Sequence, residues 1–163
     1  MKRLVMLSQL FLLSSCSLVE QAHLDIPAVT GQYELPLKVT EQDKLLIGDF
    51  MLVRNTEGYT SLVVASSLEE AKLYGLDAVS LVKQLYGFDT PKNEEIARAR
   101  KAVLAGVSEH RAIAHEELIA FYLKDNSGVE RIYYAEPESA TTYYLIESEG
   151  GDAESIFKGI RRR

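Results

Sequence analysis

The sequence predicts an α+β domain built on an antiparallel sheet. Two blocks of strand-like sequence, at about residues 33–65 and 117–148, flank a helical stretch at about residues 67–106. Each block contains a hairpin signal, in which two apolar segments are separated by a short loop with glycine. Because strands and helices are segregated along the chain, we expect one sheet with the helices on one face. The sequence leaves open whether and in which order the two blocks join.

The first strand block begins near residue 33. The tyrosine and leucines of residues 33–37 occupy alternate positions, which indicates an edge strand with these side chains on one face. Large apolar residues fill 45–53, where a Gly-Asp pair at 48–49 indicates a bulge or a bend. A turn sequence at 55–58 then leads to a returning strand at 59–65, and the two segments are predicted to pair as a hairpin.

Three helix starts follow in the middle of the chain. A capping box at 67–70 begins the first helix. Asp77 is predicted to cap a second helix, whose apolar stripe ends at Gly87. The Asp-Thr-Pro sequence at 89–91 predicts an N-cap followed by proline at the first helical position, and this third helix is expected to end at Gly106.

The second strand block is predicted to be a three-stranded meander followed by a helix. Residues 118–123 and 129–134 flank a turn sequence at 125–128, in which glycine and asparagine suit a left-handed conformation. A third strand is expected at 141–148. Asp152 is then predicted to cap a short C-terminal helix.

Composition and charge exclude several classes of function. The 163-residue chain has 24 acidic and 18 basic residues, which give a formal charge of −6. We therefore do not expect its net charge to bind nucleic acid or anionic lipid head groups. The single cysteine excludes an intramolecular disulfide and a cysteine-based metal site. Because no phosphate-binding glycine loop or nucleophile elbow occurs, the sequence assigns no cofactor and no catalytic residue.

Two histidines, His110 and His115, provide the ingredients of a metal or acid–base site, with glutamates nearby. On a helix their spacing would leave the two rings roughly 140° apart. In a strand the odd spacing would place them on opposite faces. The spacing also differs from HExxH, in which an i,i+4 pair faces one zinc ion. We expect surface or hydrogen-bonded histidines, and a small hydrolase or metal-dependent enzyme that uses them is the alternative hypothesis.

Five tyrosines fall on the three predicted strands of the second block: Tyr122, Tyr133, Tyr134, Tyr143 and Tyr144. Adjacent residues of a strand point to opposite faces, so each neighbouring pair sends one ring outward. If the strands are neighbours, the outward rings would form an aromatic patch suited to binding a protein or a glycan. The alternative interpretation is cross-strand pairing that only stabilises the sheet.

The N-terminal residues have the layout of a secretory signal peptide. Lys2 and Arg3 precede a mostly apolar run at 4–13, which is followed by small residues and Cys16. The apolar run is about half of the roughly 20 residues that a transmembrane helix needs. The sequence Leu-Ser-Ser-Cys at 13–16 resembles the lipobox of bacterial lipoproteins, whose cysteine receives the lipid, palmitate among its acyl groups, and becomes the first residue of the mature protein.

The resemblance implies a signal peptide at 1–15 and lipidation of Cys16. The interrupted pattern that follows predicts a tether at 16–30, and the strand and helix patterns predict a single α+β domain at 31–163. Ser17, in place of aspartate, favours the outer membrane in a Gram-negative cell. The expected protein is a membrane-anchored lipoprotein of the cell envelope, lipidated on Cys16. Its domain is expected to act as a non-enzymatic binding or assembly module for another envelope protein or a glycan, and not for nucleic acid.

Overall fold

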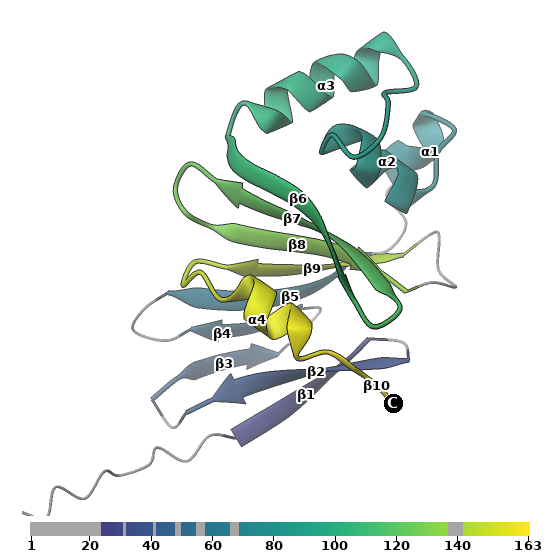
Figure 1. Cartoon of the computed structure of the whole chain (residues 1–163). Helices are drawn as coiled ribbons and strands as arrows, with labels where there is room; N and C mark the ends of the chain where they lie inside the picture. Colours follow the sequence, from purple (N-terminus) through teal and green to yellow (C-terminus); the bar gives the residue numbers. More distant parts are fainter. Residues whose placement is uncertain are drawn as a thin grey trace, which may run out of the picture.

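A computed structural model shows the arrangement of the chain in space. It describes residues 24–30, 32–40, 42–47, 50–54, 58–65, 69–136 and 142–163. The predicted signal peptide and Cys16 lie outside the described residues. Within the described ranges the chain forms two antiparallel sheets and four helices, so the predicted α+β class is confirmed (Figure 1).

The larger sheet has seven strands and joins the two predicted strand blocks. Their order is β3 (Lys44–Ile47), β4 (Phe50–Arg54), β5 (Tyr59–Ala65), β9 (Tyr143–Ser148), β8 (Glu130–Ala135), β7 (Leu118–Asp125) and β6 (Val107–His115). The blocks meet where β5 pairs with β9, with Val63 opposite Leu145. The predicted meander is present as β7, β8 and β9. Strand β6 extends the sheet through a segment to which the sequence assigned no structure.

The smaller sheet consists of β1 (Leu24–Thr30), β2 (Tyr33–Val39) and β10 (Arg161–Arg162), with β2 in the centre. Two predictions are corrected here. The second half of the expected tether is strand β1, and β2 is a central strand rather than an edge strand. The prolines that suggested interrupted structure explain the error, because Pro27 stands opposite Pro36. Both missing N–H donors therefore fall at a single position of the ladder.

Four helices connect and cover the sheets. They are α1 (Glu69–Leu73), α2 (Ala78–Leu85), α3 (Glu94–Leu104) and α4 (Ala153–Lys158). The predicted cap of α2 is confirmed, since the Asp77 carboxylate accepts a hydrogen bond from the Ser80 amide at 2.8 Å. The predicted cap of α3 is wrong by several residues. Asn93 caps this helix by accepting from the Ile96 amide at 2.9 Å.

The segment before α3 does not supply the helix cap that the sequence predicted, and it contacts α2 instead. The Lys92 amide donates to the side-chain oxygen of Gln84 on α2 at 2.7 Å, which attaches the segment to the preceding helix. The short helix α4 begins after Asp152, as predicted. The Asp152 carboxylate, however, accepts a hydrogen bond from the Ser148 hydroxyl and not from a helix amide. The capping box predicted for α1 includes residues 67–68, which lie outside the described residues.

The seven-stranded sheet has a hydrophobic core on each face. The first core lies between this sheet, α4 and β2, and the second lies between this sheet and α2. The first core includes Leu35, Leu37, Ile132, Tyr134, Ile146, Phe157 and Ile160. The second core includes Ala78, Val82, Phe121, Leu123, Tyr133 and Tyr143. Helices therefore pack on both faces of the sheet, and the expectation of a single helical face is wrong (Figure 1).

Candidate functional site

The five tyrosines expected to form a binding patch are all buried. Tyr122, Tyr133, Tyr134, Tyr143 and Tyr144 are each at most 9% exposed. The prediction of an exposed aromatic patch on the sheet is therefore wrong. Their alternation was predicted correctly, because Tyr133 and Tyr143 belong to the second core, whereas Tyr134 and Tyr144 belong to the first.

The aromatic rings pair across strands and are covered by helices. Tyr134 stacks on Tyr144 with ring centroids 5.1 Å apart, and Tyr133 lies 5.7 Å from Tyr143. On the face expected to be open, Tyr86, the C-cap residue of α2, stacks on Tyr133 at 4.9 Å, and the two hydroxyls are 2.9 Å apart. Burial raises the pKa of Tyr133 well above its ordinary value. These tyrosines serve packing, which is the alternative interpretation of the sequence.

The two histidines lie on opposite faces of β6, as the odd spacing predicted. His110 makes an edge contact with Phe88, next to the second core, at a centroid distance of 5.7 Å. His115 faces the first core, where its ring meets Phe157 at 5.9 Å and its Nε2 lies 2.9 Å from the carbonyl oxygen of Ile160. Five strand residues separate the two positions by roughly 17 Å. His110 and His115 therefore cannot share a metal ion or act on one substrate atom.

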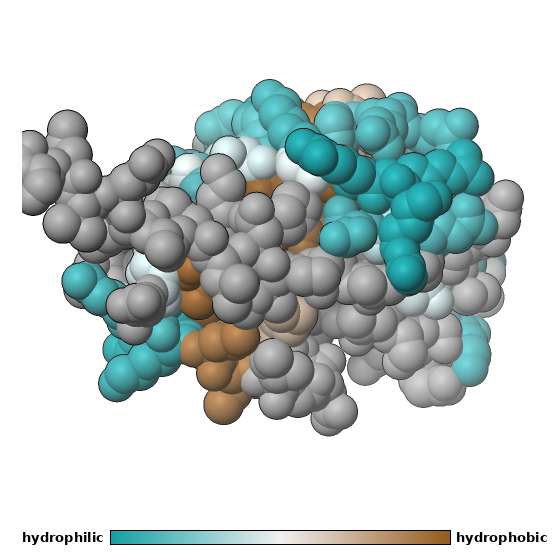
Figure 2. Space-filling view, turned by 90° about the horizontal axis from the view of Figure 1, so that it is seen from below, coloured by the Kyte–Doolittle hydropathy of each residue, from teal (hydrophilic) through white to brown (hydrophobic). Residues whose placement is uncertain are grey.

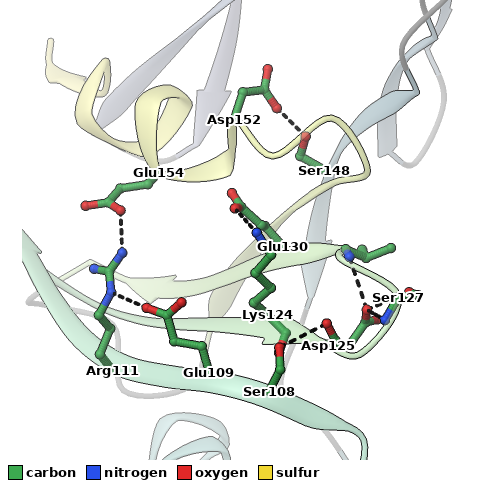
Figure 3. A network of polar contacts seen from close by, with 11 residues as sticks. Ser108, Glu109, Arg111, Lys124, Asp125, Ser127, Glu130, Ser148, Asp152 and Glu154 are labelled. Atoms are coloured by element: carbon green, nitrogen blue, oxygen red, sulfur yellow. Dashed lines mark hydrogen bonds and ion pairs between the residues drawn. The ribbon is translucent and has the colours of Figure 1, made fainter.

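The most connected polar cluster lies beneath the N-terminal end of α4, where β6, β7, β8 and β9 come together (Figure 3). Its centre is Glu130, which is only 7% exposed. Lys124 Nζ lies 3.4 Å from the Glu130 carboxylate. The hydroxyl of Tyr122 also hydrogen-bonds Glu130, and burial together with this bond raises the pKa of Tyr122. The buried carboxylate thus has both a counter-ion and a neutral hydrogen-bond partner.

A second branch of the cluster attaches α4 to β6. The Arg111 guanidinium donates to the carboxylates of Glu154 on α4 and Glu109 on its own strand. It also lies over the ring of Tyr122, with 4.3 Å to the centroid. The hydrogen bond from Arg111, reinforced by one from Lys158, lowers the pKa of Glu154 to about 2. Figure 3 shows Arg111 reaching from the strand to the helix between these two carboxylates.

A separate polar chain lies on the other face of the sheet. Arg131 of β8 pairs with Asp125 at 2.8 Å and with Glu147, which also accepts a hydrogen bond from the Tyr59 hydroxyl at 2.7 Å. Hydrogen bonds from Ser127 and Arg131 lower the pKa of Asp125. The bond to Glu147 raises the pKa of Tyr59 to about 12. These contacts connect β5, β9 and β8 to Asp125, the last residue of β7.

The side chains of these clusters form ion pairs and hydrogen bonds that stabilise the fold. Glu130 and Glu154 are each engaged by a cation, and Ser148 is fully buried with its hydroxyl bound to the Asp152 carboxylate. Among the described residues, no group of three histidine, cysteine, aspartate or glutamate side chains is placed to hold a metal ion. We therefore interpret the cluster as the attachment of α4 to the sheet.

A surface feature that the sequence did not reveal lies at the start of β3. Lys44 stands directly opposite Arg54 in the β3–β4 pair, and both side chains are exposed. Like charges in a directly opposed pair destabilise a sheet. Among the described residues, no ion pair or hydrogen bond involves the side chain of Lys44 or of Arg54. Finding this pair requires the strand register, because its members are ten residues apart.

Apolar side chains adjoin the basic pair. Leu46 follows on the same face of β3, stands opposite Leu52 and is 57% exposed. The view of Figure 2, from the side on which β1 to β3 lie in Figure 1, shows hydrophobic surface among hydrophilic groups. We name Lys44, Leu46, Leu52 and Arg54 the β3–β4 patch. Within the described ranges, it combines exposed apolar area with charged side chains that form no ion pair.

Comparison with known proteins adds no family to these observations. No protein-family model matches the chain, and a search of curated proteins returns no match. Within the described residues, no helix has both the length and the apolar character that crossing a bilayer requires.

Proposed function

We propose that the chain is a lipoprotein of the bacterial cell envelope, anchored to a membrane through an acylated Cys16 and acting as a non-enzymatic binding or assembly module. The observation that carries this proposal is the order of the N-terminal features. A basic and apolar leader ends in Leu-Ser-Ser-Cys, and the first strand of the domain, β1, begins only a few residues later, at Leu24. Serine after the cysteine favours the outer membrane of a Gram-negative cell.

Because β1 begins at Leu24, the connection between the proposed lipid anchor on Cys16 and the domain is short. Seven residues, 17–23, separate Cys16 from Leu24. Even a fully extended chain of eight Cα steps spans at most about 28 Å. An acylated Cys16 would therefore hold the two-sheet domain next to the bilayer, with much less freedom than a tether that extends to residue 30.

The geometry of the polar residues supports a binding role over the enzymatic alternative. His110 and His115 face opposite cores, and the carboxylate of Asp152 binds Ser148, whose side chain is fully buried. The tyrosines are enclosed between sheet and helices, so a partner protein or glycan would have to contact other surfaces. The β3–β4 patch is one exposed surface of the described residues that remains available to a partner.

The proposal is tested by expressing the chain in a Gram-negative host that is supplied with a labelled fatty acid. The unchanged chain should incorporate the label, lose residues 1–15 and float with the membranes in a density gradient. Cys16→Ser removes the acyl-accepting thiol, so this variant should stay unlabelled and keep its leader. Ser15→Ala keeps a small residue before the cysteine and serves as the matched control, which should be processed normally.

Two results would contradict the proposal. One is identical processing and membrane fractionation of the Cys16→Ser variant and the unchanged chain. The other is an unlabelled wild-type protein that appears in the soluble fraction. The buoyant density of the labelled membranes separates the outer from the inner membrane, which tests the sorting expected from Ser17.

A further inference from the structure

The start of β1 and the start of β3 lie at the same end of the molecule. Leu24, the first residue of β1, stands opposite Val39, the last residue of β2. A tight turn follows β2, in which the Asp43 amide donates to the Thr40 carbonyl at 3.1 Å and the Thr40 amide donates to the Asp43 carboxylate at 2.7 Å. This turn leads directly into Lys44. Figure 1 shows the beginning of β1, the end of β2 and the beginning of β3 on one side.

Consequently, the point where the chain would leave for a lipid anchor lies at the same end of the molecule as the β3–β4 patch. The patch contains two exposed cations at the end of the hairpin nearest to Leu24, followed by the exposed apolar side chain of Leu46. A cation pair of this kind, unfavourable in the isolated domain, is stabilised by an anionic surface that contacts both groups.

We infer that the β3–β4 patch docks on an anionic lipid surface, so that the domain lies against the membrane that holds its anchor; this inference rests on the proposed acylation of Cys16. Lys44 and Arg54 would contact lipid phosphates, and Leu46 would enter the boundary between head groups and acyl chains. The short connection to Cys16 keeps the patch at the membrane at high effective concentration, so a weak surface contact is sufficient.

The acidic net charge of the chain does not oppose this contact. At physiological ionic strength, exposed charges separated by more than about 8 Å are largely screened. The local sign of the patch therefore decides the interaction with lipid more than the total charge does, which is −6 for the full chain and −8 once the leader with Lys2 and Arg3 is removed. On the same face of the sheet, the carboxylates of Asp125 and Glu147 are bound to Arg131 rather than directed at the patch.

A lipid surface also fits the patch better than another protein strand. In the sheet formed by the described residues, β3 is an edge strand. Edge strands that carry an exposed lysine resist pairing with a further strand. A membrane makes no such pairing, and it uses the positive charge and the apolar side chain together.

The test uses purified, acylated protein in lipid vesicles. The mature chain has no free thiol once Cys16 is acylated, so Leu46→Cys introduces a unique site for an environment-sensitive fluorophore. Leu73→Cys is the matched reporter, because Leu73 is 84% exposed and lies on α1, far from β3 in Figure 1. Each protein is incorporated into phosphatidylcholine vesicles, either alone or mixed equally with phosphatidylglycerol, and a water-soluble quencher is added.

We expect the label at position 46 to be protected from the quencher in the anionic vesicles only, and the label at position 73 to be accessible in both. In the background of Leu46→Cys, neutralising both cations with Lys44→Gln and Arg54→Gln should lower the ratio of docked to undocked protein about 25-fold, at about five-fold per basic residue. The control Arg98→Gln with Lys101→Gln removes two exposed cations of α3 and should leave protection unchanged.

Flotation of the protein with the vesicles tests the proposed anchoring, whereas protection of position 46 tests the docking of the patch. Protein that floats with the vesicles but leaves position 46 as accessible as position 73 overturns the docking inference alone. Equal protection in neutral and anionic vesicles, or full protection after neutralisation of Lys44 and Arg54, also overturns it. Protein without acyl chains, which does not enter the vesicles at all, contradicts the proposed anchoring.

Discussion

Replacing Phe157 by alanine is expected to destabilise the domain strongly, because this side chain joins both sheets. Phe157 is fully buried on α4, with its ring 5.7 Å from Tyr134 and 5.9 Å from His115. Helix α4 lies in the first core between the seven-stranded sheet and β2. Truncation would leave a cavity bounded by both sheets, and a buried phenylalanine replaced by alanine costs about 3–5 kcal/mol.

The measurement is urea unfolding of the purified protein, followed by tyrosine fluorescence, since the chain has nine tyrosines and no tryptophan. With a slope of about 2 kcal/mol per molar urea, the expected loss lowers the midpoint by about 2 M. Leu73→Ala, at a residue that is 84% exposed, is the control and should change stability by less than about 0.5 kcal/mol. A loss below about 1 kcal/mol for Phe157→Ala would refute the packing of α4 in the first core.

Three further substitutions test local features of the structure. Glu116 has a φ of 52° in the β6–β7 turn, a left-handed conformation that asparagine adopts more readily than glutamate. Glu116→Asn should therefore raise the free energy of unfolding by about 0.5–1 kcal/mol, and a decrease would contradict the turn geometry. The pKa of Glu154 is lowered from its ordinary value to about 2 by Arg111, so this pair contributes stability above about pH 4.5 that is lost as pH falls through about 2. The difference in stability between the unchanged protein and Arg111→Gln should therefore shrink on acidification below pH 4.5, and a constant difference would show that the pair does not stabilise the fold. Tyr133→Phe removes the hydroxyl that meets the Tyr86 hydroxyl and should cost about 1 kcal/mol in thermal or urea unfolding, whereas an unchanged midpoint would mean that this hydrogen bond adds nothing.

Local sequence patterns predicted the elements that have a clear period or a strong turn. The β7–β8 hairpin is an example, because the Asp125 carboxylate accepts from the Ser127 amide and Gly128 adopts a φ of 93°, as a turn sequence of this composition favours. The opposite orientation of His110 and His115 also followed from their odd spacing alone. These features depend on residues close together in the chain, which a single sequence displays directly.

Features that depend on distant segments were not predictable in the same way. The burial of Tyr133 results from the position of α2, and no local pattern states which face of the sheet a helix will cover. The pairing of β10 with β2 brings residues more than one hundred positions apart into register. Strand β1 was missed because its proline suggested an interruption, whereas its opposition to Pro36 makes the pair compatible with a ladder.

The β3–β4 patch was not predictable from the sequence for the same reason. Lys44 and Arg54 flank an apolar segment of the sequence, and nothing in the order of residues distinguishes them from ordinary solvated charges. Only the register of β3 and β4 places them directly opposite each other. Only the start of β1 at Leu24 places that pair next to a proposed lipid anchor.

The central claim, anchoring through Cys16, is tested most directly by the mass of the N-terminal peptide of protein purified from membranes. We predict a peptide that begins at Cys16 and carries acyl chains, with residues 1–15 absent. A peptide that retains residues 1–15, or one that contains Cys16 as an unmodified thiol, would contradict the claim.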